Sequence, residues 1–192
     1  MSNPWDPMSF PLMGDHDDST LFEALGRALD KWEFVEFGLA MLYSLFVGDQ
    51  SFAKTQEYGG GKIFRERLAG LQRVAEAWFV NFPSQQLEGE FDKLTTAARG
   101  FSDRRNEFAH GLVMDVRPVM FWRSKMTLAS PNLPQFIVGP PLYLGRKHDL
   151  TGMPTFGYSS IELELIYDRM TEFELEVDRF IRTLWPSALP HG

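Results

Sequence analysis

Arg105, Asn106 and His110 combine side-chain types that suggest chemistry, within the segment RRNEFAHG at residues 104–111. A guanidinium binds phosphate or carboxylate through paired N–H donors, and an imidazole can transfer a proton near neutral pH. On a continuous helix, Asn106 and His110 lie one turn apart, so the amide can orient the imidazole. Arg105 and His110 are instead separated by about 140° and roughly 7.5 Å. A phosphate that needs both groups is therefore reached more easily from two chains that share a cleft across a two-fold axis.

Arg105 also occupies an apolar position of its predicted helix, between Phe101 and Phe108. A buried, unpaired guanidinium is costly, so Arg105 needs a partner or must border a cleft. One interpretation is that Glu36, or another acid of the first predicted helix, neutralises it. The other is that a bound phosphate supplies the negative charge. The residues alone leave both interpretations open.

The segment resembles the Rx4–6H signature of the HEPN family (higher eukaryotes and prokaryotes nucleotide-binding domains), whose helical members include metal-independent endoribonucleases. Arg105 and His110 give the four-residue spacing, and Asn106 matches the polar residue that often follows the arginine. The fuller form is Arg-Asn-x-x-x-His-Gly at the end of an amphipathic helix. With a long helix before it and a final helix after it, the resemblance covers residues 19–185.

This resemblance implies an endoribonuclease that cleaves single-stranded RNA at a composite site in a homodimer, with no metal or other cofactor. The ribose 2′-hydroxyl would attack the adjacent phosphate, leaving a 2′,3′-cyclic phosphate and a 5′-hydroxyl. His110 would be the general acid or base, and Arg105 would stabilise the phosphorane-like transition state. Asn106 would hold the reacting groups in position. Arg104 and Arg99 are candidates for substrate binding. A toxin or antiviral-defence role would bring a cognate antitoxin or regulatory protein as a partner.

Two other interpretations stay open. One is a HEPN-like helical module without catalysis, which would serve as an interaction or regulatory subunit. The other is an unrelated helical bundle that carries the motif by accident. Charge does not decide between them, because six basic residues against three acidic ones in residues 99–125 contrast with seven acids and one arginine in residues 161–178. Phe121, Trp122 and Tyr143 either stack on bases or, more commonly for such residues, pack.

Other kinds of site are disfavoured by the sequence. It contains no cysteine, which excludes disulfides and thiolate chemistry, and it contains no P-loop, G-x-S-x-G or H-E-x-x-H motif. The run Gly59-Gly60-Gly61-Lys62 lacks phosphate-loop spacing and indicates a flexible connector. His148 and His191 are expected in solvent. The cluster Asp15-His16-Asp17-Asp18 is more typical of a solvated charge run than of a metal site.

Composition and charge indicate an ordinary globular protein. The 192 residues are 44% hydrophobic and 23% charged, with a formal net charge of −7. This composition excludes a largely disordered or collagen-like chain, and the negative charge argues against indiscriminate nucleic-acid binding. No apolar run approaches the roughly 20 residues that span a bilayer. The first 18 residues lack basic residues and do not resemble a signal peptide, so we expect a cytoplasmic protein without membrane contact.

Apolar periodicity predicts an all-α fold, an antiparallel bundle of four main helices with a small β-hairpin-like excursion before the last helix. We expect a flexible arm at residues 1–18, a HEPN-like domain at 19–186 with an irregular β insertion at 113–158, and a tail at 187–192. Ser19 or Thr20 should cap the first helix, which Gly48 ends before a loop at 49–61. Further helices are expected at 62–80, 85–110 and 161–185, with Gly111 as a C-terminal cap and Pro186 as a stop.

Overall fold

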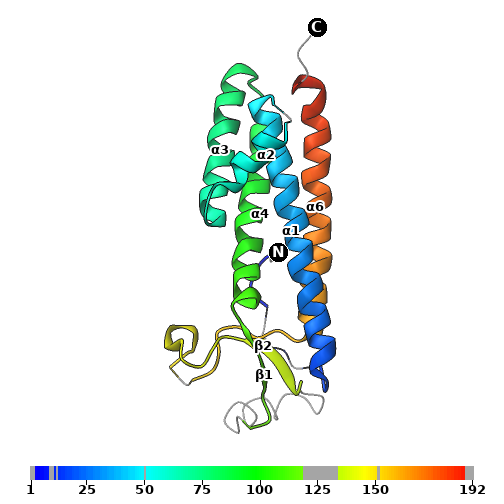
Figure 1. Cartoon of the computed structure of the whole chain (residues 1–192), viewed down its shortest axis with the longest axis vertical. Helices are drawn as coiled ribbons and strands as arrows, with labels where there is room; N and C mark the ends of the chain where they lie inside the picture. The colour runs from blue at the N-terminus through cyan, green and yellow to red at the C-terminus, as the bar shows by residue number, and fades with distance from the viewer. Residues whose placement is uncertain are drawn as a thin grey trace. The chain divides into compact units, whose positions relative to one another are not determined.

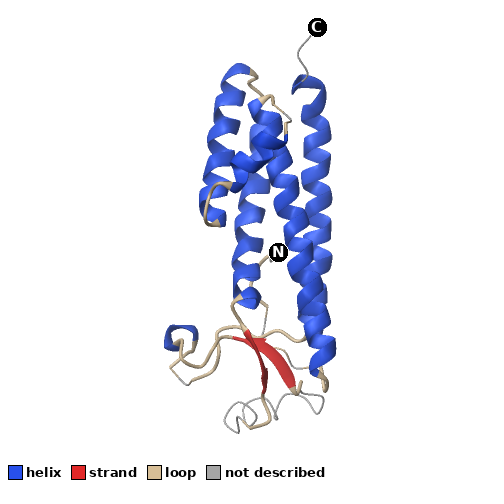
Figure 2. Ribbon diagram, in the orientation of Figure 1, coloured by secondary structure: helices blue, strands red, loops and turns tan. Residues whose placement is uncertain are grey.

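The computed structural model describes residues 3–8, 11, 13–49, 51–118, 134–150 and 152–188. Within these ranges the chain is mostly helical, with five α-helices and one two-stranded antiparallel sheet (Figure 2). The chain divides into two compact units. Unit 1 comprises Met1–Lys31 and Asp103–Arg169, and unit 2 comprises Trp32–Ser102 and Met170–Gly192.

The elements follow the predicted order, with a short helix added after the first helix and a 3-10 helix added after the strands. The helices are α1 (Asp18–Val47), α2 (Phe52–Gly59), α3 (Phe64–Asn81), α4 (Gln85–Ala109) and α6 (Ser160–Ala188). The strands are β1 (Leu112–Asp115) and β2 (Phe136–Gly139), and a short 3-10 helix, η1, spans Gly145–Lys147. None of the helices in the described ranges is both long enough and apolar enough to cross a membrane.

The prediction of a loop at 49–61 was wrong, because α2 lies within it. This helix also determines the direction in which α3 runs relative to α1. In unit 2, the ring of Trp32 lies 5.1 Å from that of Phe64, and the ring of Phe46 lies 5.6 Å from that of Trp78. Both pairs are separated by 32 positions in the sequence, so α1 and α3 run in the same direction (Figure 1). A short loop would have made these helices antiparallel, whereas α2 and its flanking turns carry the chain back beside Trp32.

In unit 2, α4 runs antiparallel to α6. The ring of Phe91 lies 6.2 Å from that of Phe180, and the ring of Phe101 lies 5.3 Å from that of Phe173. Residue numbers rise along α4 as they fall along α6, so these two helices are antiparallel. Because α4 also reverses from α3 through a three-residue connection, α1, α3 and α6 are parallel to one another. The predicted alternation of helix directions was therefore wrong.

The apolar stripes predicted for the helices form the cores of the units. In unit 1 the core includes Leu21, Ala28, Phe108, Ile137, Tyr158 and Leu163. In unit 2 it includes Val35, Leu39, Leu42, Leu71, Ala75, Leu94, Ala98, Phe101, Phe173 and Val177. Burial of these side chains provides the main force that holds the amphipathic helices in place, since most helices gain their stability from tertiary packing.

Helix ends match the predictions in part. Asp17, rather than Ser19 or Thr20, caps α1, because its carboxylate accepts the backbone N–H of Ser19 at 3.1 Å. Gly48 ends α1 in the left-handed region, with φ +74°. Helix α6 continues through Pro186 to Ala188, where proline removes only one hydrogen bond of the final turns.

The sheet anchors both the start of α6 and the N-terminal segment in unit 1. Leu112 pairs with Gly139 and Asp115 with Phe136, and Tyr158 extends the ladder by two backbone hydrogen bonds with Val138. The carboxylate of Asp15 accepts the N–H and hydroxyl of Ser160 at 2.8 and 2.6 Å. The predicted flexible arm is thus tied to the fold at Asp15. Residues 119–133 and 151 of the predicted β insertion and residues 189–192 of the predicted tail lie outside the described residues.

Candidate functional site at the end of α4

Arg105, Asn106 and His110 lie together at the C-terminal end of α4, in unit 1. The helical spacing persists to His110, whose backbone N–H donates to the carbonyl oxygen of Asn106 at 3.3 Å. Asn106 and His110 are exposed, whereas Arg105 is half-buried. The imidazole is therefore open to solvent, and it lies one helical turn from the amide, which is the spacing that the sequence predicted.

Arg105 contacts Asn106 directly. Its Nη1 donates to the side-chain oxygen of Asn106 at 3.3 Å, so the guanidinium and the amide that follows it are in contact. Glu36, which the sequence offered as a neutralising partner for Arg105, is instead bound by Arg67 in unit 2. The prediction of an acidic partner from the first helix thus fails for Glu36, and for the other acids of that helix it stays a prediction.

Arg104 is turned into the protein rather than toward solvent. Its Nη1 lies 2.9 Å from the carboxylate of Glu107, and these side chains are only 12% and 15% exposed. The phenol of Tyr158 donates to the same carboxylate. Burial and the negative charge of Glu107 raise the pKa of Tyr158 well above its usual value. Arg104 is thus committed to a network that fixes the last turn of α4, and it is not positioned as a free substrate-binding group.

Glu107 and Tyr158 are the residues of this region that sequence reasoning missed. A pair of opposite charges three residues apart, Arg104 and Glu107, was the one available signal. Tyr158 lies 51 residues away and could not be paired with Glu107 from the sequence. Arg99, the other predicted substrate-binding residue, is exposed on the part of α4 that belongs to unit 2.

Gly111 follows the motif, and the prediction that it caps the C-terminus of the helix was wrong. It is absent from the glycines with positive φ, so it is not a left-handed helix cap. A Cβ at this position would lie 2.5 Å from Cγ1 of Val138 and 3.1 Å from the carbonyl oxygen of Glu107. Glycine is therefore required because β2 packs closely against the end of α4, which holds His110 next to the sheet.

The other residues singled out by the sequence have varied surroundings. His148 is half-buried, with Nδ1 3.1 Å from the carbonyl oxygen of Leu144, which corrects its predicted place in solvent. Tyr143 is 83% exposed, and Phe121, Trp122 and His191 lie outside the described residues. No group of three or more metal-ligating side chains is arranged to hold a metal ion within the described ranges.

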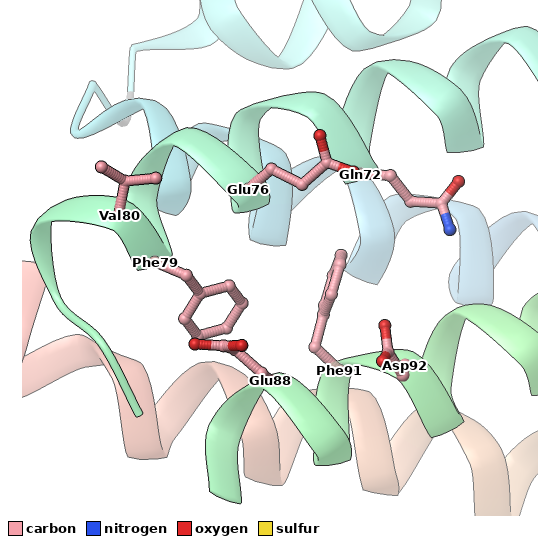
Figure 3. Close-up of a pocket in the computed structure, with 7 residues that line it drawn as sticks. All are labelled: Gln72, Glu76, Phe79, Val80, Glu88, Phe91 and Asp92. Carbon is pink, nitrogen blue, oxygen red and sulfur yellow. The ribbon is translucent and has the colours of Figure 1, made fainter. Parts of the chain in front are cut away.

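A pocket of about 380 Å³ lies between α3 and α4 in unit 2 (Figure 3). It is lined by Gln72, Glu76, Phe79, Val80, Glu88, Phe91 and Asp92. Two phenyl rings and three carboxylates thus border one space, a combination suited to a group with both an apolar part and a positive charge. None of the motif residues contributes to this pocket.

No protein-family model matches this chain, and no curated protein or solved structure matches it. The functional argument therefore depends on the geometry at the end of α4.

Proposed function

We propose that this protein is a HEPN-like, metal-independent endoribonuclease that cleaves single-stranded RNA at a composite site in a homodimer, in a toxin or defence role. In this proposal the four long helices form one HEPN-like bundle over residues 19–186. One observation carries it: exposed His110 lies one helical turn from exposed Asn106, and the guanidinium of Arg105 contacts the Asn106 amide at 3.3 Å. An imidazole and a guanidinium thus both lie within the last turns of one helix, each beside the same amide side chain.

The proposed reaction uses two copies of the motif. One His110 removes the proton of the ribose 2′-hydroxyl, and the 2′-oxygen forms a bond to the neighbouring phosphorus. The bond from phosphorus to the 5′-oxygen breaks, and that leaving oxygen takes a proton from water. Arg105 stabilises the additional negative charge on the phosphoryl oxygens.

A dimer is favoured because the guanidinium of Arg105 and the imidazole of His110 lie in different surroundings within one chain. Arg105 is half-buried against Asn106, while His110 is exposed beyond the last turn of α4. Two motifs that face each other would place two arginines and two histidines around one phosphate.

The decisive experiment measures cleavage of a fluorescent single-stranded RNA by the purified chain in the presence of a chelator. We expect 2′,3′-cyclic phosphate ends, and we expect His110→Ala to lower the rate about 100-fold or more while circular dichroism stays unchanged. His16→Ala removes another exposed histidine and should leave the rate unchanged. Equal cleavage by wild type and His110→Ala, or a monomer at high concentration, would contradict the proposal.

A non-catalytic interaction module is the second candidate, and the pocket in unit 2 favours it. Glu76, Glu88 and Asp92 beside two phenyl rings suit a lysine or arginine side chain of a partner protein. In that case the wild type would not cleave RNA, and Glu88→Gln with Asp92→Asn would weaken partner binding while Arg105→Ala would not.

A further inference from the structure

We propose that the loop at residues 140–150 is an RNA-binding arm of the same site, in which Tyr143 stacks on a base and Arg146 binds a phosphate. The inference deepens the proposed endoribonuclease function and rests on it. It assigns substrate contacts to a part of the chain outside the Arg105–His110 motif.

The sheet register places this loop beside the motif. Leu112, two residues after His110, pairs with Gly139, the last residue of β2. The loop therefore leaves the sheet at the end where α4 enters it, and Figure 1 shows it extending beside the end of α4. Tyr143 is four residues beyond Gly139, so their Cα atoms are at most about 14 Å apart. An RNA strand held at His110 is thus within reach of the loop.

Tyr143 is held outward by a hydrogen-bonded turn. The N–H of Leu144 donates to the carbonyl oxygen of Pro141 at 2.9 Å, which places Leu142 and Tyr143 at the two central positions. Pro140 and Pro141 are buried and anchor the start of the turn, whereas the two central residues are 67% and 83% exposed. The Tyr143 ring is therefore presented to solvent on a fixed base. Because the backbone is fixed and only two side-chain torsions orient the ring, stacking on a ligand costs little conformational entropy.

The second half of the loop supplies a positive charge on an equally fixed backbone. The N–H groups of Lys147 and His148 donate to the carbonyl oxygens of Leu144 and Gly145 at 2.8 and 3.1 Å. Thr155 donates its N–H to the carbonyl oxygen of Lys147 at 2.9 Å, which ties the turn back to the chain. Lys147 lies over the ring of Phe156 at 5.8 Å, while Arg146 is exposed and has no ion pair within the described part of the chain.

These features together fit single-stranded RNA. An exposed aromatic ring stacks on any unpaired base, and an exposed guanidinium beside it binds the backbone phosphate. Bases of a duplex are stacked on each other and cannot be reached in this way. Because the loop leaves the sheet next to the residue pair Leu112–Gly139, the proposed strand runs from the cleavage position at His110 toward the Tyr143 turn.

The test measures binding separately from cleavage. The full-length chain is titrated into a fluorescein-labelled, single-stranded RNA whose 2′-O-methyl groups prevent cleavage, and Kd is obtained from anisotropy. We expect Tyr143→Ala to raise Kd about 5- to 150-fold, which corresponds to the loss of one base–aromatic stack, and Tyr143→Phe to retain binding. Phe37→Ala, which removes an exposed ring of α1, is the matched control and should leave Kd unchanged.

Arg146 is tested through the salt dependence of the same binding. Loss of one phosphate contact should reduce the slope of log K against log salt by about 0.7 in Arg146→Ala. Arg65→Ala makes the same change of charge at an exposed position of α3 and should keep the wild-type slope.

The outcomes separate the inference from the proposed function. RNA cleavage that depends on His110, combined with a Kd that Tyr143→Ala does not change, overturns the binding arm and leaves the endoribonuclease. Binding that depends on Tyr143 without such cleavage supports the arm and overturns the endoribonuclease. If the wild type does not bind this RNA, the arm is overturned, and a protein partner becomes the alternative occupant.

Discussion

Arg67 on α3 donates from Nη2 to both carboxylate oxygens of Glu36 on α1, at 2.6 and 2.9 Å. The two side chains are only 19% and 14% exposed, so the ion pair is largely shielded from water. Nearby Tyr58 is buried, and its pKa is raised by that burial and by the charge of Glu36. The pair connects two helices that run parallel, whereas the predicted alternation would have made them antiparallel.

We expect Glu36→Ala to lower the free energy of unfolding by about 2 kcal/mol, because it leaves the Arg67 charge shielded and without its carboxylate. Urea denaturation measures the change. Glu23→Ala, at an exposed position of the same helix, should change stability by less than about 0.5 kcal/mol. A double variant that also carries Arg67→Met should be less destabilised than the sum of the two single changes, and simple additivity would show that the pair contributes nothing.

Tyr158 should make stability fall at alkaline pH. Its pKa is raised in the folded state by burial first and then by Glu107, so it keeps its proton above the pH at which an unfolded tyrosine, with a pKa of about 10, loses it. The unfolded state then binds fewer protons than the folded state, and the free energy of unfolding decreases as pH rises. Tyr158 alone contributes a slope of up to about 1.4 kcal/mol per pH unit above about pH 10.

The measurement compares wild type with Tyr158→Phe by urea denaturation at a series of pH values on both sides of the tyrosine pKa. The stability advantage of the wild type should shrink only at the alkaline end. Parallel pH profiles of the two proteins would show that the phenol is not held neutral by the fold.

Local sequence signals predicted the long helices because their periodicity is local. Leu21, Ala28, Val35 and Leu42 repeat every seven residues along α1 and are all buried. The segment of α2 is only eight residues long, has no such stripe and runs into Gly59-Gly60-Gly61, so a loop was the natural prediction. Its helix packs through contacts distant in sequence, such as the hydrogen bond from the Tyr43 phenol to Glu57 at 2.8 Å. Because α2 was not predicted, the parallel direction of α1 and α3 was not predicted either.

The candidate site was predicted in its spacing but not in its surroundings. Asn106 and His110 are both exposed and lie one helical turn apart, and this spacing follows from helix geometry alone. Whether an arginine faces solvent or a carboxylate depends on neighbouring elements, and Arg104 was assigned to substrate although Glu107 holds it. The composite dimer site remains a prediction, since it concerns two chains.

Mixing two inactive variants should restore cleavage if the site is shared between chains. Arg105→Ala retains His110, and His110→Ala retains Arg105, so a mixed dimer has one of each group around the common phosphate. Random reassortment places about half of the dimers in the mixed form. We expect the mixture to cleave RNA at least about ten times faster than either variant alone. A mixture with the summed activity of its two components would contradict a shared site.

Gly111→Ala tests whether close packing of the sheet holds the His110 turn. The new Cβ would lie 2.5 Å from Val138 Cγ1 and 3.3 Å from the carbonyl oxygen of Gly139, so β2 or the end of α4 must move. We expect a loss of about 1–3 kcal/mol in the free energy of unfolding and a lower RNA cleavage rate. Gly26→Ala is the matched control: nothing lies within 4 Å of its Cβ in the interior of α1, so it should stabilise the protein by about 0.5–1 kcal/mol. Adding Val138→Ala removes the closest contact, and the double variant should therefore be less destabilised than the sum of the single variants. Strict additivity, or a Gly111→Ala protein as stable as wild type, would mean that the end of α4 is not constrained by β2.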